Sequence, residues 1–169
     1  MKKVPTYLAF CAAALFLVQP LAAQQQALSA EERKIVDVIE DESKYFWNRN
    51  YEAWANLYVQ EPYVVWTAST KDGVRRFDGW NAWRDEVKRY FAADPDPMPY
   101  NGVVYKYNYR FRIYKNGAWV SFEQMNDGTK TYETRILEKE KGNWKIAMVQ
   151  LIYNANESET LVSEGDNQD

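Results

Sequence analysis

The feature that most constrains the fold is an alternation of apolar and polar side chains that begins near Val103. Five apolar or aromatic residues alternate there with four polar ones: Tyr105, Tyr107, Tyr109, Phe111 and Ile113 with Lys106, Asn108, Arg110 and Arg112. A period of two is typical of a half-buried β-strand. Hairpin-turn dipeptides follow at Asn116-Gly117, Asp127-Gly128 and Gly142-Asn143. The pattern predicts a meander of four antiparallel strands that ends near Tyr153.

The chain before Val103 is predicted to be mainly helical. Ser29 and Glu32 have the spacing of a capping box, so a helix is expected over 29–48. A short helix around Trp54 ends before Pro62, and two short strands are expected over 63–67 and 74–77. A third helix follows, with Asp78 as its expected N-cap. Helices on one face of a curved sheet make an α+β domain.

Three motifs in this order resemble nuclear transport factor two-like, SnoaL-like domains. They are the helix "YEAWANLY", the helix start "FDGWNAW", and the closing hairpin "TRILEKEKGNWKIAMVQLIY". The resemblance covers residues 28–154. It implies a ketosteroid isomerase-like cone, in which three N-terminal helices pack on a strongly curved, mainly antiparallel sheet and enclose one pocket, often in a homodimer. Such domains include isomerases, dehydratases, cyclases and non-enzymatic modules, so the resemblance implies no single activity.

The two ends of the chain are expected to lie outside this domain. Lys2-Lys3, the apolar run over 7–18 and the small residues before Gln24 have the layout of a cleavable signal peptide over residues 1–23. We therefore expect export to the periplasm or exterior of a bacterium, without a membrane anchor after cleavage. The acidic segment over residues 155–169 is predicted to be disordered.

Composition excludes several classes of site. The chain has no histidine, and its single cysteine, Cys11, lies within the predicted signal peptide. This excludes histidine bases and thiolate metal sites in the mature chain.

With 24 acidic against 21 basic side chains and no basic cluster, no nucleic-acid partner is expected. No metal-ligand spacing occurs, so no metal or cofactor is expected. The 7 Trp, 13 Tyr and 7 Phe predict an aromatic interior or cavity.

The turns predict which strand residues face the interior. If Asn116-Gly117 and Gly142-Asn143 are two-residue loops, Phe111 faces Phe122 and Arg135 faces Gln150. An even-length middle turn keeps the same alternation. The inner face would then include Tyr105, Tyr107, Tyr109, Gln124, Glu133, Arg135, Met148 and Gln150, whereas Lys106 would lie on the other face.

Glu133 and Arg135 are charged residues on this predicted inner wall, where an unpaired charge is costly. Three interpretations are open. Arg135 forms a structural ion pair with Glu133, or with Glu42 on the first helix. Alternatively, Arg135 anchors a carboxylate or carbonyl of a ligand. Finally, a register error of one residue would turn both charges to solvent.

The predicted ligand-binding set combines this polar patch with nearby aromatics: Arg135, Glu133, Gln150, Gln124, Tyr107 and Tyr109, with Trp47 and Trp66 at the pocket mouth. The first functional hypothesis is a binding domain for a small apolar or weakly acidic ligand. A second is an isomerase, dehydratase or cyclase with Glu133 as base and Tyr109 or Arg135 as hydrogen-bond donor. A third is a homodimeric assembly module, in which Tyr114, Trp119 and Tyr132 lie on the outer sheet face.

Overall fold

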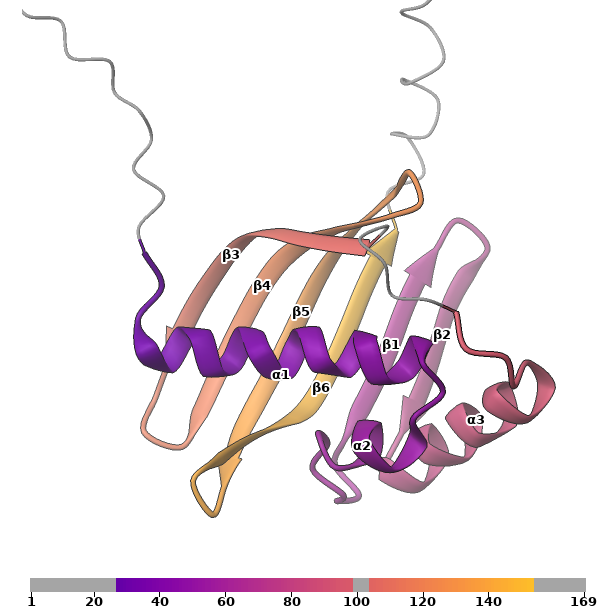
Figure 1. The fold of residues 1–169 in the computed structure, drawn as a ribbon, viewed down its shortest axis with the longest axis horizontal. Coiled ribbons are helices and arrows are strands. Elements are labelled where there is room, and N and C mark those ends of the chain that lie inside the picture. The colour runs from indigo at the N-terminus through magenta and orange to yellow at the C-terminus, as the bar shows by residue number, and fades with distance from the viewer. Residues whose placement is uncertain (1–26, 99–103, 154–169) are drawn as a thin grey trace, which may run out of the picture.

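The computed structural model describes residues 27–98 and 104–153, which form three helices and one six-stranded sheet (Figure 1). The predicted signal peptide and acidic tail lie outside the described residues. The elements in chain order are α1 (Ala30–Trp47), α2 (Tyr51–Ala55), β1 (Val65–Thr70), β2 (Gly73–Asp78), α3 (Trp80–Ala93), β3 (Val104–Ile113), β4 (Gly117–Asn126), β5 (Thr129–Glu140) and β6 (Asn143–Tyr153).

The sheet has the strand order β2-β1-β6-β5-β4-β3. Neighbouring strands are antiparallel except β1 and β6, which pair in parallel. The helices lie along one face of the sheet, which curls around α1 without closing into a barrel (Figure 1). This arrangement confirms the predicted α+β fold class of helices on a curved, mainly antiparallel sheet.

Helix α1 begins as the sequence predicts. The Ser29 hydroxyl accepts a hydrogen bond from the Glu32 backbone N–H, and the Glu32 carboxylate accepts one from the Ser29 backbone N–H. These reciprocal bonds satisfy two backbone donors that the first turn would otherwise leave free. Ile35 and Ile39 on the same helix are fully buried against the sheet side of the core. The helix is thus fixed at its start and along one face.

Helix α3 begins one residue later than the sequence prediction. Its N-cap is Gly79, whereas Asp78 ends β2 and pairs with Arg76. Gly79 has a φ of 89°, and a Cβ atom placed there would lie 3.3 Å from the backbone oxygen of Pro62. Glycine tolerates both conditions because it has no side chain. The need for a positive φ and a close approach therefore outweighs the capping preference of aspartate.

The β3–β4 hairpin turns one residue earlier than predicted. The Tyr114 N–H donates to the Gly117 carbonyl at 2.7 Å, so the two-residue loop is Lys115-Asn116, and Phe111 pairs with Val120 rather than with Phe122.

A β-bulge between Tyr107 and Arg110, with Asn108 at a φ of 56°, then reverses the alternation. Lys106 therefore lies on the inner face beside Gln124, while Tyr105 and Tyr107 face outward, contrary to prediction.

The β5–β6 hairpin differs from its predicted register in the same two ways. The loop is Lys141-Gly142, with φ angles of 49° and 86°. A register shift then follows, because Leu137 pairs with Ile146 and Ile136 with Met148, which leaves one extra residue on β6. Arg135 therefore pairs with Val149. Met148 and Gln150 consequently face outward, and the prediction that they face inward is wrong. A single extra residue moves every later side chain to the opposite face.

The middle turn, Asp127-Gly128, is a two-residue loop, which meets the condition under which the predicted alternation continues, and it pairs Phe122 with Glu133 and Val120 with Arg135. Glu133 and Arg135 are 2% and 3% exposed, so both charges lie on the inner wall. The prediction of an inward Glu133 and Arg135 is confirmed, and the interpretation that turned them to solvent is wrong.

Candidate functional site

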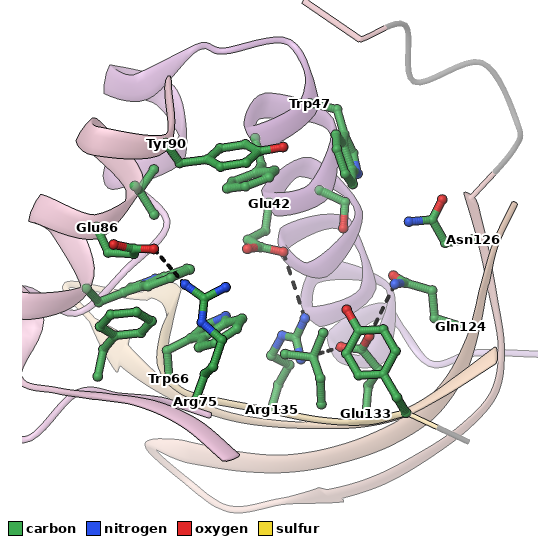
Figure 2. A pocket seen from close by; sticks show the side chains of 17 residues that line it. Glu42, Trp47, Trp66, Arg75, Glu86, Tyr90, Gln124, Asn126, Glu133 and Arg135 are labelled. Carbon is green, nitrogen blue, oxygen red and sulfur yellow. Dashed lines mark hydrogen bonds and ion pairs between the residues drawn. The ribbon is translucent and has the colours of Figure 1, made fainter. Parts of the chain in front are cut away.

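A cavity of about 310 Å³ lies between α1, α3 and the inner face of the sheet (Figure 2). Its volume is at the lower end of the range for small-molecule sites, about 300–1,000 Å³. It is lined by Glu42, Ser43, Phe46, Trp47, Trp66, Arg75, Phe77, Trp83, Glu86, Val87, Tyr90, Gln124, Asn126, Glu133, Arg135, Leu151 and Tyr153.

The lining residues follow the helical or strand periodicity of the element that carries them. Helix α1 presents Glu42, Phe46 and their neighbours, and α3 presents Trp83, Glu86, Val87 and Tyr90, which recur every three or four residues along one helix face. The strands contribute alternate residues, such as Glu133 and Arg135 on β5 and Leu151 and Tyr153 on β6. Five strands and two helices therefore converge on one cavity.

A buried charge network forms the inner wall of the cavity. Arg135 Nη1 donates to Glu133 Oε2 at 2.7 Å, and Arg135 Nη2 lies 3.9 Å from Glu42 Oε2 (Figure 2). Burial alone would lower the pKa of Arg135, but the attraction of Glu133 and Glu42 raises it overall, so the guanidinium stays charged. The structural pairing that the sequence left open is therefore present, with both carboxylates.

Glu133 is held by three hydrogen-bond donors. Its Oε1 accepts from Thr131 Oγ1 at 2.8 Å and from Gln124 Nε2 at 3.2 Å, while Oε2 accepts from Arg135. These contacts compensate the cost of burying its charge. Both carboxylate oxygens of Glu133 are thus engaged by donors of the protein itself.

Glu42 is bound differently on its two oxygens. Oε1 accepts from the Tyr58 hydroxyl at 2.8 Å and lies 3.5 Å from Trp54 Nε1. Burial, and next the negative charge of Glu42, raise the pKa of Tyr58 well above its ordinary value, which keeps the phenol a donor. Oε2 has only the Arg135 contact at 3.9 Å among the described residues, beyond hydrogen-bond distance.

Two aromatic clusters form the other walls. Trp66 stacks on Trp83 with ring centroids 4.6 Å apart and an interplanar angle of 14°, and Phe77 lies 5.7 Å from Trp66. Phe46 stacks on Tyr90 at 5.4 Å, with Trp47 edge-on to Phe46 at 5.3 Å. Such walls offer ring faces and edges to an aromatic guest.

A second ion pair lies across the cavity from Glu133. Arg75 Nη2 donates to Glu86 Oε1 at 2.8 Å (Figure 2). Glu86 also accepts from Arg89 at 2.9 and 2.7 Å. Hydrogen bonding from Arg89, and then the charges of Arg89 and Arg75, lower the pKa of Glu86 against the effect of burial. One carboxylate therefore serves two guanidinium groups at this side.

Five of the predicted ligand-binding residues line this cavity: Arg135, Glu133, Gln124, Trp47 and Trp66. Gln150 pairs with Thr134 on the outer face, and Tyr107 also faces outward, because each lies beyond a β-bulge. Their predicted place in the pocket is wrong. Tyr109 is half-buried on the inner face but outside the cavity lining, and its hydroxyl donates to Glu40 Oε1 at 3.0 Å.

Several lining residues were missing from the predicted set, notably Arg75, Glu86, Tyr90 and Tyr153. Glu42 was predicted only as a structural partner of Arg135. The helical residues could have been found from spacing, because Glu86 and Tyr90 share the face of α3 that carries Trp83. Arg75 and Tyr153 offered no such signal, because their orientation depends on strand pairing.

The described residues contain no group of three or more acidic side chains placed to hold a metal ion. Within residues 27–98 and 104–153, no helix is both long and apolar enough to cross a membrane.

No family model matches the sequence, and no curated protein matches it. Solved structures do match. An NTF2-like (nuclear transport factor two-like) protein of unknown function from Shewanella oneidensis is 17% identical, with a TM-score of 0.55 over 71% of this chain and 97% of its own. A similar protein from Methylobacillus flagellatus is 14% identical, with a TM-score of 0.57 over 76% and 97%.

A proposed ketosteroid isomerase from Parabacteroides distasonis is 14% identical, with a TM-score of 0.54 over 72% of this chain and 86% of its own. Matches at these identities establish the architecture and leave activity open. The chain has the NTF2-like fold that its sequence motifs predict.

Proposed function

We propose that this chain is a small-molecule-binding domain and that the cavity between α1, α3 and the sheet is its binding site. The observation that carries the proposal is the charge network of Glu42, Arg135 and Glu133 on the wall of an otherwise aromatic cavity. Apolar walls with a few converging polar groups are typical of ligand sites. A buried ion network is weak evidence for a stabilising role. Ligand recognition is therefore a reason for the network to lie on the cavity wall.

Thermal shift with a panel of hydrophobic acids, polycyclic alcohols and lactones tests this proposal. We expect at least one compound to raise the melting temperature of the native protein, since a ligand that binds only the folded state stabilises it. Trp66→Ala removes one aromatic wall and should weaken that compound about tenfold, as expected for losing one aromatic contact of about 1.5 kcal/mol.

Tyr114→Ala is the matched control, because Tyr114 is exposed and lies outside the cavity lining. It should leave the shift unchanged. Silence across the panel, or an equal shift in Trp66→Ala, would contradict the proposal.

An isomerase, dehydratase or cyclase is the second candidate, because a carboxylate in a largely apolar cavity is what proton abstraction beside a carbonyl requires. The similarity in fold to a proposed ketosteroid isomerase supports this class only at the level of architecture. Turnover that survives both Glu133→Gln and Glu42→Gln would exclude the two carboxylates of the inner wall as bases.

We further propose that the protein acts after export, in the periplasm or outside a bacterial cell. The support is the signal-like layout of residues 1–23. Sequencing the mature N-terminus tests this, and a mature chain that still begins at Met1 would contradict it.

A further inference from the structure

The inner wall of the cavity holds one hydrogen-bond acceptor and one donor that do not reach each other. Glu42 Oε2 and Arg135 Nη2 are 3.9 Å apart, and both residues line the cavity (Figure 2). A charge-assisted hydrogen bond would need about 2.8 Å. The Nε of Arg135 is also buried and has no partner among the described residues. The pair is therefore open to a third group.

The chemistry of that third group follows from the pair. It must accept a hydrogen bond from the guanidinium and donate one to the carboxylate at the same time. A carboxamide carries an acceptor and a donor side by side, so it can do both. A carboxylate offers two acceptors, one of which would oppose Glu42, and an ammonium offers only donors, which would oppose Arg135.

The charge around the pair also favours an uncharged group. Glu42 and Glu133 bring two negative charges to the inner wall, and Arg135 brings one positive charge. The nearby Lys106 is paired with Glu40 at 3.0 Å. An anionic head would therefore meet an excess of negative charge in a setting that water screens poorly.

The walls determine the body of the ligand. Trp66 and Phe77 on one side, and Phe46 and Tyr90 on the other, present ring surfaces to the cavity. The volume of about 310 Å³ is small for a ligand site, so it suits a compact planar ring system rather than a long chain.

We infer that the cavity binds an uncharged aromatic carboxamide or lactam, with its amide seated between Glu42 Oε2 and Arg135 Nη2. The inference rests on the proposed binding function and names the ligand class for that site.

Four probes of one ring system test the inference by titration calorimetry at neutral pH: naphthamide, naphthoate, methyl naphthoate and naphthalene. The ester accepts but cannot donate, and the acid is an anion. We expect naphthamide to bind at least about tenfold more tightly than each of the others, as a hydrogen bond to a charged group predicts.

The outcomes separate the inference from the function on which it rests. Equal binding of all four probes, or binding of naphthoate as tight as that of naphthamide, overturns the amide site while the binding function stands. Equal binding of naphthamide and methyl naphthoate also overturns it. A water molecule bridging Glu42 Oε2 and Arg135 Nη2 would then be enough to explain their separation of 3.9 Å. Binding of none of the four overturns the amide site, and the thermal-shift panel then decides the binding function separately.

Glu42→Gln supplies a second readout. The amide of the new residue retains an acceptor for Tyr58 but presents no carboxylate to the ligand. We expect the preference for naphthamide over naphthoate to fall about tenfold or more in this variant. Glu52→Gln on α2, an exposed residue outside the cavity lining, is the matched control and should keep the preference. An unchanged preference in Glu42→Gln overturns the inference. If that variant does not fold, the four probes on the native chain still decide.

Discussion

At the scale of single residues, Arg135 is the side chain on which the inner wall depends. It is 3% exposed and lies between two buried carboxylates, Glu133 at 2.7 Å and Glu42 at 3.9 Å. The three groups compensate one another only while all are present, because each was removed from water on folding. Removing the Arg135 cation should therefore lower the free energy of unfolding far more than removing an arginine whose ion pair is exposed on the surface.

We predict that Arg135→Leu destabilises the protein by about 3–5 kcal/mol, since it leaves two buried carboxylates without their cation. Urea denaturation followed by tryptophan fluorescence measures this. The double variant Arg135→Leu with Glu133→Leu should recover part of the loss, because one stranded charge is removed as well.

Arg76→Leu is the control for this prediction, because its pair with Asp78 is exposed to solvent. We expect little change in its unfolding midpoint. A loss in Arg135→Leu no larger than that of Arg76→Leu would contradict a structural role for the network.

At the scale of elements, the sequence correctly predicted the strands and helices. It predicted which strand residues face the cavity for only part of the sheet. The period of two over β3 and the turn dipeptides are local signals, and they correctly predicted a four-strand meander. The bulges near Asn108 and opposite Ile136 depend on pairing between strands. A β-bulge reverses alternation without leaving a local sequence signal that we recognised.

The consequence is visible in particular residues. Glu133, Arg135 and Gln124 were placed correctly because the turn between their strands has an even length, the condition on which the predicted alternation depended. Gln150 and Tyr107 were misplaced because each lies past a bulge, and Lys106 was misplaced for the same reason. The site could thus be predicted where register is set by the nearest turn, and not beyond the first irregularity.

At the scale of the whole molecule, the outer face of the sheet carries an exposed apolar patch. We call this the outer patch; its members are Trp119, Tyr132, Ile136 and Ile152, which are 43%, 42%, 37% and 44% exposed. They lie on the central strands β4, β5 and β6, and Trp119 pairs with Ile136 while Tyr132 pairs with Ile152. No helix of the described residues covers this face (Figure 1). The polar row of Ser121, Thr134 and Gln150 lies between these two pairs. Exposed apolar side chains gathered on one uncovered sheet face are typical of interaction sites.

We propose that a second copy of the chain covers the outer patch, and predict a homodimer at micromolar concentration. Sedimentation velocity measures its mass. Trp119→Lys should shift the protein toward monomer, because a charge would be buried within the apolar contact.

Tyr63→Lys is the control for the dimer, because Tyr63 is exposed but lies outside the sheet strands. It should leave the mass unchanged. A monomeric native protein would contradict the proposal, and so would an unaltered mass in Trp119→Lys.

The parallel pairing of β1 with β6 has a consequence for the order in which the molecule can form. β6 is the last strand of the described residues, and among them it is also the only strand that joins β1 and β2 to the rest of the sheet. The hairpins of β3 to β6 are local in sequence and close small loops, whereas the β1–β6 contact closes a long one at a larger entropic cost. The helices and strands before β3 therefore have no complete sheet to fold against until β6 has been synthesised.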